Sequence, residues 1–352
     1  MALITMLKFG LFDHVDYNGK PLGEQLEDRL KLVGLLEAER YDVYHVAEHH
    51  STPLGTIPSP SVFLAAVAER TKRIRFGPLV YVLPLHHPLR LYEEICLLDH
   101  LSGGRLELGV GKGGALFEHH RYGVGADVAT AQAMYHEAFS VLMEACANEV
   151  LNFEGRYFKF NDYLVRAKPL QRPHPPIWYG AASVEGLDWA VPRAVNVVSL
   201  GPTSRATDIS RRYRRDWVAA GRAACDLPCI GILRHIVVAE TDGAALRIAG
   251  EAYKAWRESM EFLWQRCGVA FPLAAAYPHR FDELQALGHG VAGSPTRVRT
   301  YIEDLVRDTG VNYIGCQMVF GSMPLEAAAR SIQLFAREVV PKLLLSSESG
   351  CR

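Results

Sequence analysis

The chain has 352 residues, of which 49% are hydrophobic and 22% are charged. This balance is that of a globular protein and excludes disordered, collagen-like and low-complexity chains. The 38 Lys and Arg residues nearly cancel the 39 Asp and Glu residues, which leaves a formal net charge of −1. Because no basic stripe is present to meet a phosphate backbone or an anionic membrane, we expect neither nucleic acid nor membrane as a partner.

The N-terminal residues and the cysteines indicate a cytoplasmic protein. Met1 to Phe9 has no cationic segment followed by a long apolar run and a cleavage site, and no stretch reaches the ~18 apolar residues of a membrane span. The seven cysteines, including Cys351, are scattered, and only Cys225 and Cys229 are close together. Their spacing indicates neither a disulfide framework nor a zinc site, so free thiols are expected.

Strand-like and helix-like segments alternate along nearly the whole chain. Short apolar runs predict eight strands, at 7–12, 43–47, 74–83, 105–111, 176–181, 194–200, 230–239 and 312–320. Helical spacing predicts helices at 22–40, 59–72, 88–101, 127–149, from 183 onward, 204–221, 244–266, 295–308 and 324–345. The residues from Phe117 to Gly125 are expected to form a loop.

Eight strands alternating with helices predict an α/β fold, a closed (β/α)8 TIM barrel, rather than two open-sheet domains. No linker divides the chain, so residues 1–352 are expected to form a single domain. Two segments are not needed for the eight strands and helices of a barrel, and we predict them to be insertions after strands four and seven. We expect 152–174 to form a hairpin and 267–293 to form a mobile cover over the active site.

Histidines and a glutamate fall at the carboxyl ends of the predicted strands, where barrels of this kind carry their active sites. Strand two ends at Glu48, His49 and His50, and His86-His87 follows strand three. Histidines are candidate metal ligands, but neighbouring residues of a strand point to opposite faces, so adjacent pairs chelate poorly. Packing or hydrogen bonding is the simpler role, and no metal site is predicted. A metal-dependent barrel hydrolase stays open as an alternative function.

Strand four ends in a glycine-rich turn, Gly109-Val110-Gly111-Lys112-Gly113-Gly114. It matches the G-x-G-x-x-G pattern, but the helix that a dinucleotide fold needs does not open at once. The turn is either a tight strand end or a cradle in which backbone N–H groups and Lys112 meet phosphate oxygens. Ser183, at the expected start of the next helix but one, is either a helix N-cap or a phosphate ligand, and these two roles share one geometry.

Several stretches spread over nearly the whole length of the chain form recognisable motifs: LKFGLF (7–12), AEHH (47–50), LDHLSGGRLELGVG (98–111), FEGRYF (153–158), PHPPIWYGAAS (173–183) and GSPTRVRTYIEDLVRDTGVNYI (293–314). In these stretches the sequence resembles the bacterial luciferase-like family of flavin-dependent monooxygenases. The paired histidines and the LDHLSGGRLELGVG stretch are specific together. The resemblance implies a barrel with non-barrel insertions, which binds reduced FMN (a deazaflavin in some relatives), uses O2, and forms a homodimer or a family heterodimer.

The resemblance also implies roles for individual residues. It implies that Lys112 and Ser183 bind the flavin phosphate, with Gly111, Gly113 and Ala182 beside them. His49 is implicated in the oxygen chemistry, and Glu48 and His50 next to it complete the expected catalytic group. A non-proline cis peptide beneath the flavin ring is expected at Leu79–Val80, which makes Val80 a cofactor contact. The luciferases carry an arginine, a reactive cysteine and an acidic residue where this chain has Thr130, Gly111 and Ala182, so we do not expect light emission.

The function that follows is that of a two-component monooxygenase. A separate flavin reductase would supply reduced FMN, which would react with O2 to a C4a-peroxyflavin and oxidise a small organic substrate. An apolar substrate is expected from the residues predicted at the rim of the barrel, which are Leu83, Leu85, Phe117, Tyr122 and Phe271. A non-catalytic flavin-binding relative stays open as an alternative.

Overall fold

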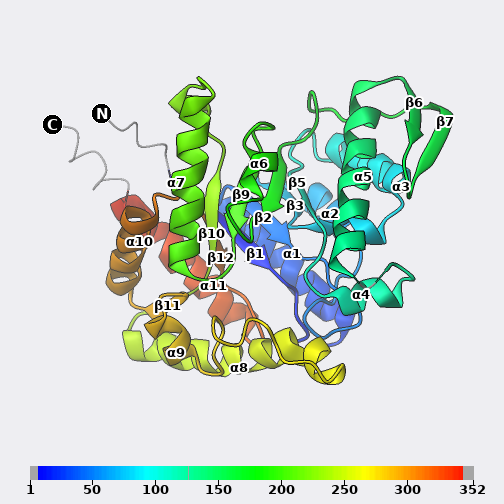
Figure 1. Cartoon of the computed structure of the whole chain (residues 1–352). Coiled ribbons are helices and arrows are strands. Elements are labelled where there is room, and N and C mark those ends of the chain that lie inside the picture. Colours follow the sequence, from blue (N-terminus) through cyan, green and yellow to red (C-terminus); the bar gives the residue numbers. More distant parts are fainter. Residues whose placement is uncertain (1–6, 126, 344–352) are drawn as a thin grey trace.

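The computed structural model describes residues 7–125 and 127–343, and its main feature is one large sheet surrounded by helices (Figure 1). Ten strands of the described chain form this sheet in the order β3-β2-β1-β12-β10-β9-β8-β5-β4, with β11 paired to β10. All strand pairs within the sheet are parallel. A further parallel bridge joins Phe76 of β3 to Leu106, which precedes β5, and so connects the two ends of the strand order. The strands are β1 (Lys8–Asp13), β2 (Val43–Val46), β3 (Arg75–Pro78), β4 (Tyr81–Val82), β5 (Leu108–Gly111), β8 (Ile177–Gly180), β9 (Asn196–Ser199), β10 (Ile230–Val238), β11 (Gly290–Gly293) and β12 (Tyr313–Gln317).

The predicted barrel is confirmed as a nearly closed parallel barrel with helices outside it, and two details differ from the prediction. The third predicted strand is divided into β3 and β4 at the Leu79–Val80 bond, which is cis. The second difference is β11, which pairs with the carboxyl-terminal half of β10 while β12 pairs with its first half. The nine-residue β10 pairs with β9 over Ile230–Ile232, with β12 over Gly231–His235 and with β11 over His235–Val238.

Most helices lie close to their predicted bounds because their apolar spacing is regular. The helices are α1 (Leu22–Ala38), α2 (Pro60–Arg70), α3 (Pro88–Leu101), α4 (Leu116–Arg121), α5 (Val128–Ala147), α6 (Leu187–Ala190), α7 (Thr203–Ala219), α8 (Asp242–Arg266), α9 (Phe281–Ala286), α10 (Pro295–Thr309) and α11 (Leu325–Leu334), which continues into a π-helical turn. Two predictions were wrong: the expected loop after Phe117 contains α4, and the helix after β8 starts at Leu187 rather than at Ser183. The predicted end of the last helix, at 345, lies outside the described residues.

The two segments predicted as insertions have regular structure of their own. An antiparallel hairpin of β6 (Val150–Glu154) and β7 (Lys159–Leu164) lies between α5 and β8, and Figure 1 shows it beside α5 at the upper right. The segment 267–293 follows α8 and contains α9 and β11, along the lower edge of the same view. Since β11 belongs to the sheet, the end of this segment is not a loop. That the rest covers the active site stays a prediction.

The interior of the barrel is filled by apolar and aromatic side chains from seven of its strands or strand ends. They form one buried cluster, separate from the larger cluster between the sheet and the helices. The interior cluster consists of Phe12, Val43, Ala47, Leu79, Trp178, Val198, Leu233 and Tyr313. Such filling is typical of barrels with this number of strands, in which the interior is a packed core and not a pore.

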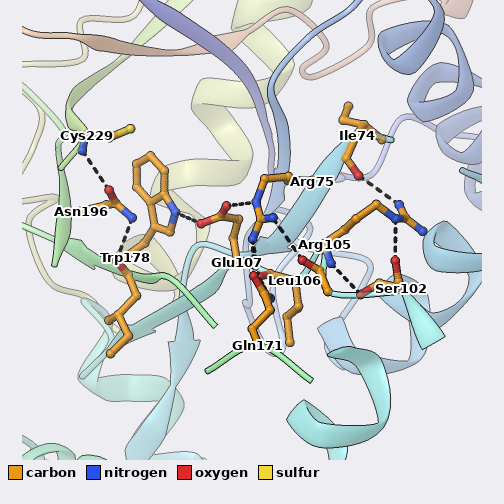
Figure 2. A network of polar contacts seen from close by, with 12 residues as sticks. Ile74, Arg75, Ser102, Arg105, Leu106, Glu107, Gln171, Trp178, Asn196 and Cys229 are labelled. Carbon is orange, nitrogen blue, oxygen red and sulfur yellow. Dashed lines mark hydrogen bonds and ion pairs between the residues drawn. The ribbon is translucent and has the colours of Figure 1, made fainter. Parts of the chain in front are cut away.

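A polar network closes the end of the barrel where the strands begin (Figure 2). The buried carboxylate of Glu107 pairs with Arg75 and accepts a hydrogen bond from the Trp178 indole at 2.6 Å. Near Trp178 in the same view, Asn196 accepts a hydrogen bond from the backbone N–H of Cys229 at 2.8 Å. Because Arg75 and Asn196 are the first residues of β3 and β9, this network lies at the amino-terminal ends of the strands, away from the candidate site described next.

Candidate functional site

Every predicted site residue lies at or just beyond the carboxyl end of a barrel strand. Glu48, His49 and His50 follow β2, and Val80 lies between β3 and β4. Gly111 is the last residue of β5, and Lys112 and Gly113 come directly after it. Ala182 and Ser183 follow β8. This is the end of the barrel at which enzymes of this fold carry their active sites.

Glu48 is a buried carboxylate that holds two imidazoles. Its Oε1 lies 2.9 Å from Nε2 of His50, and Nε2 of His86 lies 2.9 Å and 3.0 Å from its two oxygens. The backbone N–H of Val82 donates to Oε2 at 2.9 Å. Burial would raise the pKa of Glu48, but the hydrogen bonds from His50, His86 and Val82 and the charge of His86 outweigh it and lower the pKa to about 2. Glu48 therefore stays ionised at neutral pH and orients the two rings.

The adjacent histidines His49 and His50 are held differently by Glu118 of α4 and by Tyr122, which follows α4. The backbone N–H of His50 donates to Oε1 of Glu118 at 2.7 Å, and Nδ1 of His49 lies 3.4 Å from the same oxygen. Nδ1 of His50 lies 2.9 Å from the hydroxyl of Tyr122. Both ring nitrogens of His50 are thus engaged, whereas His49 is held through Nδ1 alone and its side chain stays 26% exposed. His49 is the ring of the pair that is available for chemistry.

Val80, which directly precedes β4, packs closely against Gly111, the last residue of β5. A Cβ atom on Gly111 would lie 2.5 Å from Cγ2 of Val80, so only glycine fits there without a shift. Gly113 has a φ of +80° and is approached in the same way by Val82. The cis peptide expected at Leu79–Val80 is present. Val80 is half-buried and packs on the interior cluster, so its outer side forms an apolar floor at the mouth of the barrel.

Lys112, Ala182 and Ser183 form the neighbouring rim. β5 and β8 are paired with Val110 opposite Tyr179, so Lys112 and Ala182 follow adjacent strand ends. Lys112 is half-buried, and Ala182 and Ser183 are exposed.

The prediction that Ser183 opens a helix is wrong, because residues 182–186 form bends and a turn before the short α6. The Ser183 side chain instead interacts with the carboxylate of Glu185 and lowers the pKa of Glu185.

Sequence reasoning missed Glu118 and did not connect His86 to Glu48. Glu118 lies on the six-residue α4, within the segment expected to be a loop, and so short a helix has no periodic pattern to reveal it. His86 is 38 residues from Glu48, and their contact depends on the barrel closing.

One of the expected rim residues, Leu83, needs correction, and the surroundings of another, Phe271, are now defined. Leu83 is buried in the cluster between sheet and helices, so it does not face the mouth. Phe271 contacts Trp264, which in turn contacts Phe117 edge to face. Phe117 and Trp264 belong to a cavity of about 570 Å³ between α4 and the end of α8, lined by Gly114, Leu116, Phe117, His120, Arg121, Trp264 and Cys267.

Other kinds of site receive no support from the described part of the chain. Within residues 7–125 and 127–343, no group of three or more His, Cys, Asp or Glu side chains is placed to hold a metal ion. None of the described helices combines the length and the apolar composition that crossing a bilayer requires. The six described cysteines are all free thiols, and Cys351 lies outside the described residues.

Comparison with known proteins gives matches over nearly the full length. An uncharacterized protein, y4wF, of Sinorhizobium fredii is 37% identical over 341 residues, which cover 97% of this chain and 98% of that protein. The oxygenase component of the flavin-dependent trigonelline monooxygenase of Acinetobacter baylyi is 27% identical over 70% of this chain and 69% of its own length.

Among solved structures, the monooxygenase RslO1 from Streptomyces bottropensis superposes with a TM-score of 0.82 at 26% identity, covering 96% of this chain and 99% of that one. The oxygenating constituent of 3,6-diketocamphane monooxygenase from Pseudomonas putida, solved in complex with FMN, has a TM-score of 0.78 at 21% identity and shares the fold over 96% of this chain and 98% of its own.

The family model of luciferase-like monooxygenases matches residues 1–313. With a model match over most of its length and a barrel mouth built as described, the chain belongs to the luciferase-like monooxygenase family of enzymes.

Proposed function

We propose that this protein is a flavin-dependent monooxygenase that uses reduced FMN and O2 to oxidise a small apolar organic substrate. The observation that carries the proposal is the barrel mouth, where an apolar floor, the cationic side chain of Lys112 and a histidine held by one buried carboxylate meet. The flavin-dependent trigonelline enzyme and the FMN-bound camphane enzyme support the choice of cofactor.

The residues present fit a flavin mononucleotide. The glycines at 111 and 113 leave space that a Cβ atom would fill, and Val80 offers an apolar surface for a flat ring. At the rim, Lys112 provides a positive charge and Ser183 a hydroxyl, which are suitable partners for a phosphate. We therefore assign the ring to Val80 and Gly111 and the phosphate to Lys112 and Ser183, with Gly113 and Ala182 lining the passage between them.

When bound, reduced FMN supplies the electrons that activate dioxygen for insertion into the substrate. The chain's own task is to hold the ring, exclude water and move a proton. His49 is placed for the proton step because its Nε2 is not engaged by protein groups among the described residues. Glu48 and His50 keep the neighbouring strand end in place and act on the reaction only through that position.

The cavity beside α4 supports an apolar substrate. Phe117 and Trp264 contribute aromatic surface to it, and Gly114 connects it to the turn at 111–113. A flavin reductase as a separate partner is supported by the trigonelline relative, whose name identifies it as the oxygenase component of its enzyme.

The test is an anaerobic titration of the protein with reduced FMN, followed by admission of O2. We expect saturable binding of one flavin per chain and a rate of flavin reoxidation that differs from that of free reduced FMN. Absence of binding overturns the proposal. Binding with reoxidation identical to that of free flavin identifies a non-catalytic flavin-binding protein instead.

A further inference from the structure

A second histidine, His14, lies beside His49 at the mouth of the barrel. The two rings are stacked, with centroids 5.7 Å apart and an interplanar angle of 24°. Phe12 belongs to the interior cluster, and residues two apart along a strand share a face, so His14 extends the same inward face beyond the end of β1. The ring of His14 also contacts Phe12 edge to face at 4.8 Å.

The tautomer of His14 is set by Trp256. Nε1 of Trp256 lies 3.3 Å from Nδ1 of His14, and because an indole N–H can only donate, Nδ1 must accept. The side-chain amide of Gln317 lies 3.5 Å from the same nitrogen. Burial, and after it the nearby His49 and His235, lower the pKa of His14 well below its ordinary value, so the ring is neutral. A neutral ring whose Nδ1 accepts carries its proton on Nε2.

The tautomer of His49 is set the opposite way by Glu118. The carboxylate of Glu118 is buried and can only accept, so the nitrogen that faces it at 3.4 Å, Nδ1, carries the proton. In the neutral form of His49, Nε2 is then a free acceptor. The hydrogen bonds found for the described His14 and His49 side chains all involve Nδ1, which leaves both Nε2 atoms for a ligand.

We propose that His14 and His49 are a donor and an acceptor of opposite tautomer that together orient a hydroxyl group of the substrate. The hydroxyl oxygen accepts from Nε2–H of His14, and the hydroxyl hydrogen is donated to Nε2 of His49. A carbonyl group would engage His14 alone, so the pair favours alcohols and phenols. Trp256 and Glu118 are positioning residues, and the assignment of the ligand rests on the proposed function.

The tautomers are measured directly by long-range ¹H–¹⁵N correlation on the flavin-free full chain labelled with ¹⁵N-histidine. His14→Phe and His49→Phe identify the two sets of signals. We expect a proton on Nε2 of His14 and on Nδ1 of His49, and the same tautomer in both rings overturns the proposal. Trp256→Phe removes the indole donor and should release His14 from its single tautomer. Trp264→Phe, on the same helix but in contact with Phe117 and Phe271, is the matched control and should change neither ring.

The ligand class is tested with phenol and toluene, in which a methyl group replaces the hydroxyl. The wild-type protein should bind phenol about 5-fold more tightly, the factor expected for a typical net hydrogen bond, and His14→Phe should abolish this preference. Equal affinity, or binding of neither probe, overturns the proposal.

Titration of the same variant with reduced FMN separates this inference from the proposed function. FMN affinity should be unchanged in His14→Phe, and a loss of it would place His14 against the cofactor and overturn the assignment to substrate. If wild-type protein binds no reduced FMN, the proposed function fails, and this holds for any tautomers found for His14 and His49.

Discussion

Nε2 of His86 lies within 3.0 Å of both carboxylate oxygens of Glu48, although the two residues come from different strand ends. Burial lowers the pKa of His86, but the hydrogen bond and charge of Glu48 outweigh it and raise the pKa above the ordinary value of 6.5. A raised pKa means that the pair's stabilisation is complete below pH 6.5 and is lost as the pH rises through the folded-state value. Glu48 is ionised over this whole range because its own pKa is about 2.

His86→Gln should therefore cost about 1–2 kcal/mol of unfolding free energy at about pH 6, and less at about pH 9. Urea unfolding of both proteins at the two pH values measures this. His87→Gln is the control, because His87 is exposed and packs on Phe158 and Phe160. A difference for His86→Gln that does not change with pH would contradict the assignment.

His49→Ala should reduce turnover while flavin binding is retained. Loss of a general acid or base typically costs about 10²–10⁴-fold. The measurement is incorporation of ¹⁸O from labelled dioxygen into organic product, with reduced FMN supplied in excess. His136→Ala, an exposed histidine on α5, should keep the wild-type rate. Equal rates for wild type and His49→Ala would remove His49 from the mechanism.

Lys112→Ala and Ser183→Ala should each weaken binding of reduced FMN. A charge-assisted contact to phosphate contributes about 1.5–3 kcal/mol, which corresponds to a loss of about 10-fold or more. Anaerobic titration with riboflavin, which has no phosphate, is the control and should show the same affinity in the variants as in wild type. A parallel loss of riboflavin binding would mean that the variants disturb the site as a whole.

Glu185→Gln should have the opposite effect on FMN affinity. The Glu185 carboxylate interacts with the Ser183 side chain and carries a negative charge beside the site that we assign to the phosphate. Removing the charge should tighten binding a few-fold at low ionic strength, and the gain should shrink as salt is added because exposed charges are screened. Unchanged affinity at low salt would place the phosphate elsewhere.

Gly111→Ala should destabilise the strand end and weaken flavin binding. The added methyl group would lie 2.5 Å from Cγ2 of Val80, and such overpacking typically costs about 1–3 kcal/mol. Gly114→Ala is the matched control, because a Cβ there meets nothing within 4 Å. Combining Gly111→Ala with Val80→Ala should recover much of the stability in thermal unfolding. Equal melting temperatures for the two single variants would contradict the close packing.

Local patterns in the sequence were sufficient to predict most of the architecture. Alternating apolar runs and helical spacing predicted the barrel, and the bounds of α3 agree with the predicted 88–101. Short elements without a period were missed: α4 was expected to be a loop, β11 was not expected, and the helix after β8 was placed too early. Six or fewer residues give too few repeats to show a periodicity above chance.

The candidate site also has a part that the sequence predicted and a part that it did not. Glu48, His49 and the turn at Gly111–Gly113 could be named from the sequence because each is a contiguous motif at a strand end. The sequence did not reveal the residues that set the protonation of the histidines and of Glu48. His86 contacts Glu48 although 38 residues separate them, and Trp256 contacts His14 although 242 residues separate them. The sequence by itself determined which residues lie together at the strand ends of the candidate site. How their protons are arranged was decided only when barrel closure brought distant side chains within hydrogen-bonding distance, because a hydrogen bond depends on position in space and not on separation in sequence.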